Sequence, residues 1–254
     1  MCGRFTLKTP VAEVARLFEA DVPPEVDLPP RYNIAPTQPV VAVRLRGSSG
    51  ERELALLRWG LLPAWVKDPA EWPTLINARA ETLDRKPAFE DAVRGRRCLV
   101  PADGFYEWRR ERGGKQPYYV RARDGSLLAF AGLWEERTDA SGETLASCTI
   151  VTTDANSLLR PLHDRMPVML DVGGQARWLD PKLRSYRELE PLLRPVAAER
   201  LVVHPVSRVV NRTEVDDPSC IEPLVPAPGR PADGDAGAEP EPAGESEPQQ
   251  LDLL

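Results

Sequence analysis

The sequence contains few of the side chains that usually bind metal ions or form disulfides. Among 254 residues there are only four cysteines and two histidines. No two cysteines form a Cys-x-x-Cys pair, so neither a zinc site nor a disulfide framework is indicated. We therefore expect no metal, no cofactor and no disulfide. The residues concerned are Cys2, Cys98, Cys148, Cys220, His163 and His204.

Long apolar segments are also missing from the chain. No apolar run approaches 18 residues, and the N-terminus has no charged region followed by an apolar stretch. A membrane-spanning helix needs about 20 predominantly apolar residues, and a secretory signal needs both of those N-terminal features. These absences predict a soluble cytoplasmic protein.

The net charge of -6 originates at one end of the chain. Residues 226–254 hold seven of the 39 acidic and one of the 33 basic residues, so residues 1–225 carry 32 of each. The acidic segment is rich in Pro, Gly, Ala and Glu, a composition that predicts disorder. We expect one domain over residues 1–225. Because that domain is neutral overall, a nucleic-acid site in it must come from locally grouped arginines.

Hydrophobic patterning within the domain indicates many strands and several short helices. No repeat and no regular alternation of strand and helix is present, which predicts an α+β fold: a single domain on a curved, largely antiparallel, barrel-like sheet with short peripheral helices. The predicted strands span residues 40–46, 53–60, 96–110, 116–122, 126–136 and 146–155. The predicted helices span residues 11–20, 86–95, 155–162, 173–180 and 185–194.

The chain begins MCGRF, which places a cysteine directly after the initiator methionine. Met1 is usually removed before a residue as small as Cys, and its removal leaves Cys2 with a free amine and a thiol on adjacent carbons. The amine titrates near ~8 and the thiol near ~8.5, so a fraction of each is nucleophilic at neutral pH. Such an aminothiol can attack one electrophile twice. A cysteine can also occupy this position by chance. The dipeptide alone does not establish a reactive residue, because the reactivity of a thiol depends on its surroundings.

Seven short motifs occur in a characteristic order along the chain. They are MCGRF, RYNIAP (31–36), RWGLLPAW (58–65), INARAET (76–82), DGFYEW (103–108), HDRMP (163–167) and HPVS (204–207). In sequence and spacing they resemble the SRAP (SOS response-associated peptidase) family of abasic-site processing proteins, over residues 2–225. The resemblance implies a DNA-damage protein that shields abasic sites in single-stranded DNA by forming a thiazolidine crosslink through Cys2.

The resemblance also implies catalytic roles for residues at the matching positions. Glu107 corresponds to the family's acid–base carboxylate, and His163 to the histidine that promotes opening of the sugar ring. Asn77 would orient the Cys2 amine or the sugar by hydrogen bonds. Each residue also has a purely structural interpretation: Asn77 could cap a helix, Glu107 could be solvated on a strand, and His163 could lie on a loop surface.

The same comparison implies a set of DNA contacts. Three arginines would hold the phosphates beside the lesion, two tryptophans would stack on neighbouring bases, and two residues of RYNIAP would line the pocket. The sequence departs from some relatives at Val66, where they carry a second aromatic residue. The predicted contact residues are Arg4, Asn33, Pro36, Trp65, Arg79, Trp108 and Arg165.

Two other functions account for part of the same sequence. Glutamine amidotransferases also use an N-terminal cysteine, but their later glutamine-binding motifs are absent here. A non-catalytic DNA-damage adaptor would bind DNA without needing Cys2. The family's peptidase label refers to proposed autocatalytic exposure of Cys2. The resemblance also implies AP-lyase activity. Removal of Met1 by an ordinary aminopeptidase is an equal alternative to autocatalytic removal.

The last residues, QQLDLL, place leucines in a segment that has no core to bury them. They resemble the pentapeptide with which bacterial proteins bind the replication sliding clamp. A partner's pocket is the natural place for such leucines. We therefore expect the motif to tether the protein at the replication fork, near single-strand to double-strand junctions. We expect the protein itself to be a monomer. The motif consists of Gln250, Leu251, Asp252, Leu253 and Leu254.

Overall fold

The computed structural model describes residues 2–47, 50–66, 72–138 and 142–224. The strands are β1 (Phe5–Leu7), β2 (Ala20–Asp21), β3 (Arg31–Ile34), β4 (Pro39–Leu45), β5 (Arg52–Trp59), β6 (Asn77–Arg79), β7 (Arg97–Ala102), β8 (Gly104–Glu111), β9 (Gly114–Ala122), β10 (Leu128–Thr138), β11 (Thr144–Asp154), β12 (Arg165–Pro167) and β13 (Leu201–Pro205). The α-helices are α1 (Val11–Phe18), α2 (Pro87–Gly95), α3 (Val172–Leu179) and α4 (Tyr186–Leu189). The predicted acidic segment 226–254 and its terminal motif lie outside the described residues.

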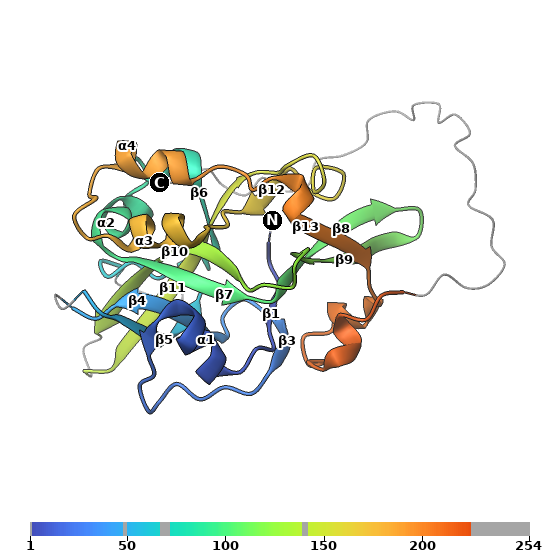
Figure 1. The fold of residues 1–254 in the computed structure, drawn as a ribbon, viewed down its shortest axis with the longest axis horizontal. Coiled ribbons are helices and arrows are strands. Elements are labelled where there is room, and N and C mark those ends of the chain that lie inside the picture. The colour runs from blue at the N-terminus through green and yellow to red at the C-terminus, as the bar shows by residue number, and fades with distance from the viewer. Residues whose placement is uncertain (1, 48–49, 67–71, 139–141, 225–254) are drawn as a thin grey trace.

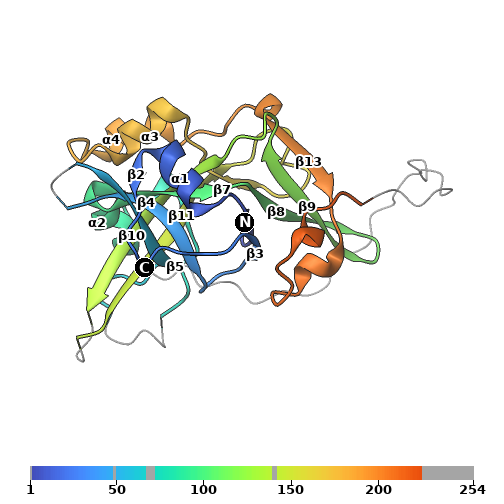
Figure 2. The same ribbon diagram turned by 60° about the horizontal axis from the view of Figure 1, so that its bottom comes forward.

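Five strands close into a barrel, which confirms the predicted fold class. Antiparallel pairing runs in the order β5, β4, β7, β10, β11, and a parallel contact between β11 and β5 completes the circuit. A closed barrel leaves these strands no free edge and turns one face of each toward a shared core. Figures 1 and 2 show the short helices at the periphery of this barrel. No helix in the described ranges is long and apolar enough to cross a membrane.

A second sheet carries the N-terminus and places it at the candidate site. Its strand order is β13, β9, β8, β1, β3, so β1 has a neighbour on each side. Phe5 of β1 is buried, and its ring lies edge-on to Trp59 at 5.1 Å and Phe130 at 6.3 Å in the barrel core. Antiparallel pairing sets Phe5 opposite Phe105 of β8. The register therefore brings the residues before Phe5 alongside the residues that follow Phe105.

Two of the predicted elements beside the site differ in the structure, and strands β1, β6 and β12 lie outside the predicted strands. Residues 96–110 form two strands because the Asp103 carboxylate accepts hydrogen bonds from Lys8 N and Thr9 N and fixes a turn between β7 and β8. The predicted helix at 155–162 is wrong: this segment forms turns. There the Asn156 side chain accepts from Leu159 N and donates to Val196 O, which holds the segment as a loop.

Candidate active site

Cys2 lies buried three positions before β1 and is held by a side-chain amide from another strand. Its side chain is inaccessible to solvent, and its Sγ lies 3.9 Å from Arg4 O. Asn77 Nδ2, at the first position of β6, donates to Cys2 O at 3.0 Å. The other amide atom, Asn77 Oδ1, is buried without a hydrogen-bond partner among the described residues. An unsatisfied buried oxygen is suited to receive an additional N–H donor.

Glu107 on β8 is a nearly inaccessible carboxyl close to this thiol. Burial raises the pKa of Glu107 to about 7, so both of its protonation states are populated near neutral pH. Burial, and after it the charge of Glu107, raises the pKa of the Cys2 thiol, which stays protonated at neutral pH. These shifts pair a proton carrier that works near pH 7 with a thiol that must lose its proton before it can react.

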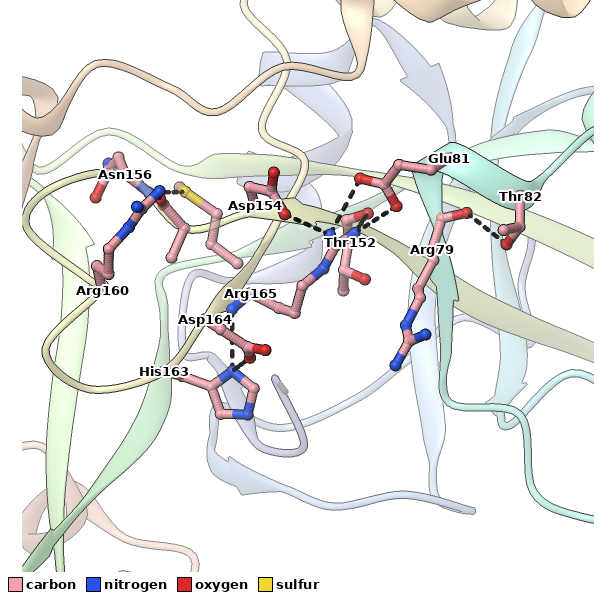
Figure 3. A network of polar contacts seen from close by, with 12 residues as sticks. Arg79, Glu81, Thr82, Thr152, Asp154, Asn156, Arg160, His163, Asp164 and Arg165 are labelled. Atoms are coloured by element: carbon pink, nitrogen blue, oxygen red, sulfur yellow. Dashed lines mark hydrogen bonds and ion pairs between the residues drawn. The ribbon is translucent and has the colours of Figure 1, made fainter. Parts of the chain in front are cut away.

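His163 follows the loop at 155–162 and is held by its own neighbours (Figure 3). Its Nδ1 accepts a hydrogen bond from Arg165 N at 3.0 Å and lies 2.6 Å from Asp164 Oδ1. These contacts require different states, because Nδ1 must be unprotonated to accept from Arg165 and protonated to donate to Asp164. Burial lowers the pKa of His163, which favours the neutral ring; in that ring Nδ1 can accept from Arg165 N only when the proton is on Nε2.

One open groove brings four of the predicted residues together. Glu107, His163, Arg4 and Trp108 line it, and its volume is about 720 Å³. Trp108 is fixed by a hydrogen bond from Nε1 to Asn211 Oδ1 at 2.8 Å. The remaining lining residues are Arg109, Arg110, Lys115, Pro161, Leu162 and Asn211. Sequence reasoning missed all of these, although Arg109 and Arg110 directly follow the DGFYEW motif.

Two of the predicted phosphate-binding arginines occupy different environments (Figure 3). Arg79 is exposed, and no side chain that the structure describes binds its guanidinium. Arg165 is only 11% exposed and donates to Glu81 Oε1 at 3.0 Å, Glu81 Oε2 at 2.9 Å and Asp154 Oδ1 at 2.7 Å. In the structure the guanidinium of Arg165, which we expect to contact phosphates, joins β12 to the segment that follows β6. Glu81 lies within the INARAET motif but is not among the predicted site residues.

The RYNIAP residues and Trp65 lie outside the residues that line this groove. Asn33 is completely buried, so it cannot touch DNA directly in this conformation, but its Oδ1 accepts from Arg4 Nη1 at 2.6 Å. Pro36 is partly buried after β3. Trp65 is 52% exposed and packs edge-on against Trp72 with ring centroids 5.0 Å apart. Val66, the point of departure from some relatives, is buried.

The four cysteines are buried free thiols. Within the described ranges, no three His, Cys, Asp or Glu side chains are grouped so that they could hold a metal ion. The groove presents a carboxyl of raised pKa, an imidazole and several cationic groups, and the buried Cys2 thiol is close enough for the charge of Glu107 to raise its pKa.

Solved structures of other proteins share this α+β fold, a barrel with an attached second sheet. A protein from Bacteroides thetaiotaomicron superposes with a TM-score of 0.80 at 27% identity, covering 88% of this chain and 100% of that one. Residues 1–213 match the family described as SOS response associated peptidase (SRAP). The chain belongs to the SRAP family, as the seven motifs predicted.

Curated relatives include bacterial and vertebrate proteins. The chain is 41% identical over 224 residues to the abasic site processing protein YoqW of Bacillus subtilis (strain 168), which covers 87% of this chain and 99% of the relative. It is 35% identical over 229 residues to the abasic site processing protein HMCES of Xenopus tropicalis, covering 77% of this chain and 67% of the relative.

Proposed function

We propose that this protein recognises abasic sites in single-stranded DNA and forms a covalent thiazolidine with them through Cys2, after Met1 has been removed. The observation that carries the proposal is the position of Cys2 between Asn77 and the Glu107 carboxyl, beside a groove that also contains His163. The names of the relatives support DNA with abasic sites as the substrate. An amidotransferase would also need glutamine-binding residues, and a DNA adaptor would not need the buried thiol.

The first step of the proposed reaction is opening of the abasic deoxyribose to its aldehyde. His163 presents the proton of Nε2 while Nδ1 accepts from the backbone, so it can donate to the ring oxygen of the sugar. The Cys2 amine then attacks the aldehyde carbon, and loss of water gives an imine. Asn77 Oδ1 is the acceptor that can orient this amine, since it has no other partner among the described residues.

In the second step the thiol adds to the imine carbon. A new C–S bond forms, the C=N bond becomes a single bond, and the proton leaves sulfur and is delivered to nitrogen, so that one water is the only by-product of the whole sequence. Glu107 is the proposed carrier of this proton, because its pKa of about 7 lets it accept and release protons at neutral pH. Ring closure within one residue is intramolecular, and good orientation can supply roughly 7–11 kcal/mol of the barrier.

Residues of the groove, together with the exposed Arg79 and Trp65, would make the DNA contacts. Arg79 and Arg4 would contact phosphates beside the lesion, while Trp108 and Trp65 offer faces on which bases can stack. Arg165 supports this surface through Glu81. The proposal also includes a preference for single-strand to double-strand junctions, location at the nucleoid and lyase activity. It further includes binding of the terminal motif to the sliding clamp, although that motif lies outside the described residues.

The decisive experiment is denaturing gel electrophoresis after incubation with single-stranded DNA that contains one abasic site. We expect a heat-stable covalent band with the wild-type protein and none with intact DNA. Cys2→Ala, or a protein with one residue added before Cys2, should give no band, because each lacks one half of the aminothiol. Cys98→Ala removes a buried thiol of the barrel and should crosslink like the wild type. Crosslinking by Cys2→Ala at the wild-type rate would eliminate the thiazolidine mechanism.

Substitutions of His163 and Arg79 are expected to affect different steps, the first the crosslinking rate and the second the DNA affinity. His163→Ala should slow crosslinking roughly 10²-fold or more with nearly unchanged DNA affinity, since it removes a proton donor. Arg79→Ala should weaken affinity and lower the salt dependence of binding by about 0.7 in the log–log slope, since it removes a phosphate contact. Single-turnover crosslinking and fluorescence anisotropy measure the two effects. An equal loss of affinity in both variants would contradict this division of roles.

A further inference from the structure

The hairpin of β8 and β9 carries positive charge that the fold does not neutralise. Residues 109–115 hold four basic side chains and one acidic side chain, in a domain that is neutral overall, so the rest of the domain carries a net charge of -3. The single acid, Glu111, forms an ion pair with Arg109 at 2.5 Å and accepts a hydrogen bond from the Tyr118 hydroxyl at 3.2 Å. The hairpin projects from the body of the molecule (Figure 1). Its remaining cations therefore face solvent rather than carboxylates.

Arg110 and Lys115 are opposite each other in this hairpin. The antiparallel register pairs them directly, and both side chains are exposed. Like charges directly opposite each other destabilise a sheet. In the described part of the chain neither side chain has a hydrogen-bonding or ion-pair partner. An anion bound between the two side chains would convert this repulsion into attraction.

These two cations lie on the same groove as the proposed reactive residues. Arg110 and Lys115 line it together with Glu107 and His163, and Trp108 lies between the two groups along β8. Arg110 lies three positions after Glu107, a distance of about 10 Å along a strand. That is the length of roughly three stacked nucleotides at 3.4 Å per nucleotide. A DNA strand that follows the groove would reach the pair within a few nucleotides of the lesion.

We propose that Arg110 and Lys115 form a phosphate-binding site for the DNA strand as it leaves the active site. The ligand is a backbone phosphodiester, bound through charge and independent of the base beside it. The choice of DNA as the source of the phosphate rests on the proposed function. Like Arg4 and Arg79, the pair would hold backbone, but a few nucleotides further along the strand.

The test uses the double variant Arg110→Gln, Lys115→Gln and fluorescence anisotropy. The probe is a single-stranded oligonucleotide with a central tetrahydrofuran residue, an abasic analogue that cannot open to an aldehyde, so that only non-covalent binding is measured. We expect affinity to fall about tenfold and the log–log salt slope to fall by at least about 0.7. The matched control Lys182→Gln, Arg187→Gln removes two exposed cations from the α3–α4 region and should bind like the wild type.

Two further measurements separate this site from a general effect of charge or of folding. With an oligonucleotide trimmed to one nucleotide on each side of the analogue, the variant and the wild type should bind equally. The melting temperature of the variant should be unchanged or higher, because the repulsion between the two cations is gone. An unchanged affinity, or an equal loss in the control or on the trimmed probe, would overturn the site. Failure of the wild type to crosslink abasic DNA would instead count against the proposed function.

Discussion

Glu107→Gln is expected to make the protein more stable and its reaction slower. The glutamine keeps the size of the side chain but cannot exchange protons. If Glu107 carries the proton between sulfur and nitrogen, crosslinking should slow by roughly 10²–10⁴-fold. Its pH dependence near 7 should also disappear, since that is where the pKa of Glu107 lies. Single-turnover rates measured between pH 5.5 and 8.5 test both statements.

The stability gain follows from the direction of the pKa shift. Burial raises the pKa of Glu107 from 4.5 to about 7, so the folded protein holds this proton more tightly than the unfolded chain. The free energy of unfolding therefore falls as the pH rises from 4.5 to 7, and the loss persists above pH 7. A neutral glutamine avoids this loss, which amounts to about 3 kcal/mol at pH 8.

Urea denaturation at pH 8 and at pH 4.5 measures this effect. The variant should be more stable than the wild type at pH 8, and the difference should vanish at pH 4.5. Glu199→Gln, which replaces an exposed carboxylate, should differ little from the wild type at either pH. A variant that crosslinks at the wild-type rate, with an unchanged pH profile, would remove Glu107 from the mechanism.

Asn33→Ala is expected to cause the second large loss, in stability and in DNA affinity together. Asn33 Nδ2 donates to the carbonyl oxygens of Val210, Arg212 and Val215, at 3.1, 2.9 and 2.7 Å. Its Oδ1 accepts from the Arg4 guanidinium. The alanine removes the donor from three carbonyl groups, two of them part-buried, and removes the charge-assisted hydrogen bond from Arg4. We expect the free energy of unfolding to fall by about 3 kcal/mol.

Affinity should fall because Arg4, which lines the groove, loses one of its two acceptors and keeps only Val210 O, at 2.9 Å. Asn33→Asp is the informative companion, since it keeps the acceptor for Arg4 and loses the donors to the three carbonyls. It should restore much of the affinity while the protein stays less stable. Chemical denaturation and anisotropy with tetrahydrofuran DNA give the two values. A stability change below about 1 kcal/mol in the alanine variant would show that the hydrogen bonds of Asn33 do not stabilise the fold as proposed.

The parts of the fold that depend on local patterns could be predicted from the sequence. Strands β4, β5, β10 and β11 were visible because their β-branched and apolar residues recur at strand spacing. The parallel contact of β11 with β5 was not, because it joins segments about 90 residues apart and leaves no local trace. The loop at 155–162 was misread as a helix, since its leucines are spaced as on a helix face while Asn156 and Pro161 interrupt it.

The candidate site shows the same division. Cys2, Glu107 and His163 could be picked out because each stands in a recognisable motif. Sequence gives no sign that the Arg165 guanidinium is taken up by Glu81 and Asp154, or that Asn33 binds carbonyl groups about 180 residues further on. Such pairings are decided by tertiary packing, so a motif can identify a residue's importance without distinguishing a ligand contact from a structural one.

The location of β1 in the interior of its sheet has a mechanical consequence. In the proposed adduct, the covalent bond to DNA begins at the residue three positions before β1, and β1 is hydrogen-bonded to β3 on one edge and β8 on the other. Tension applied to the DNA would be transmitted to a strand clamped on both sides and anchored through Phe5 in the barrel core. A motor that pulls on such a strand must shear both ladders together, so the adduct would resist mechanical displacement along the DNA.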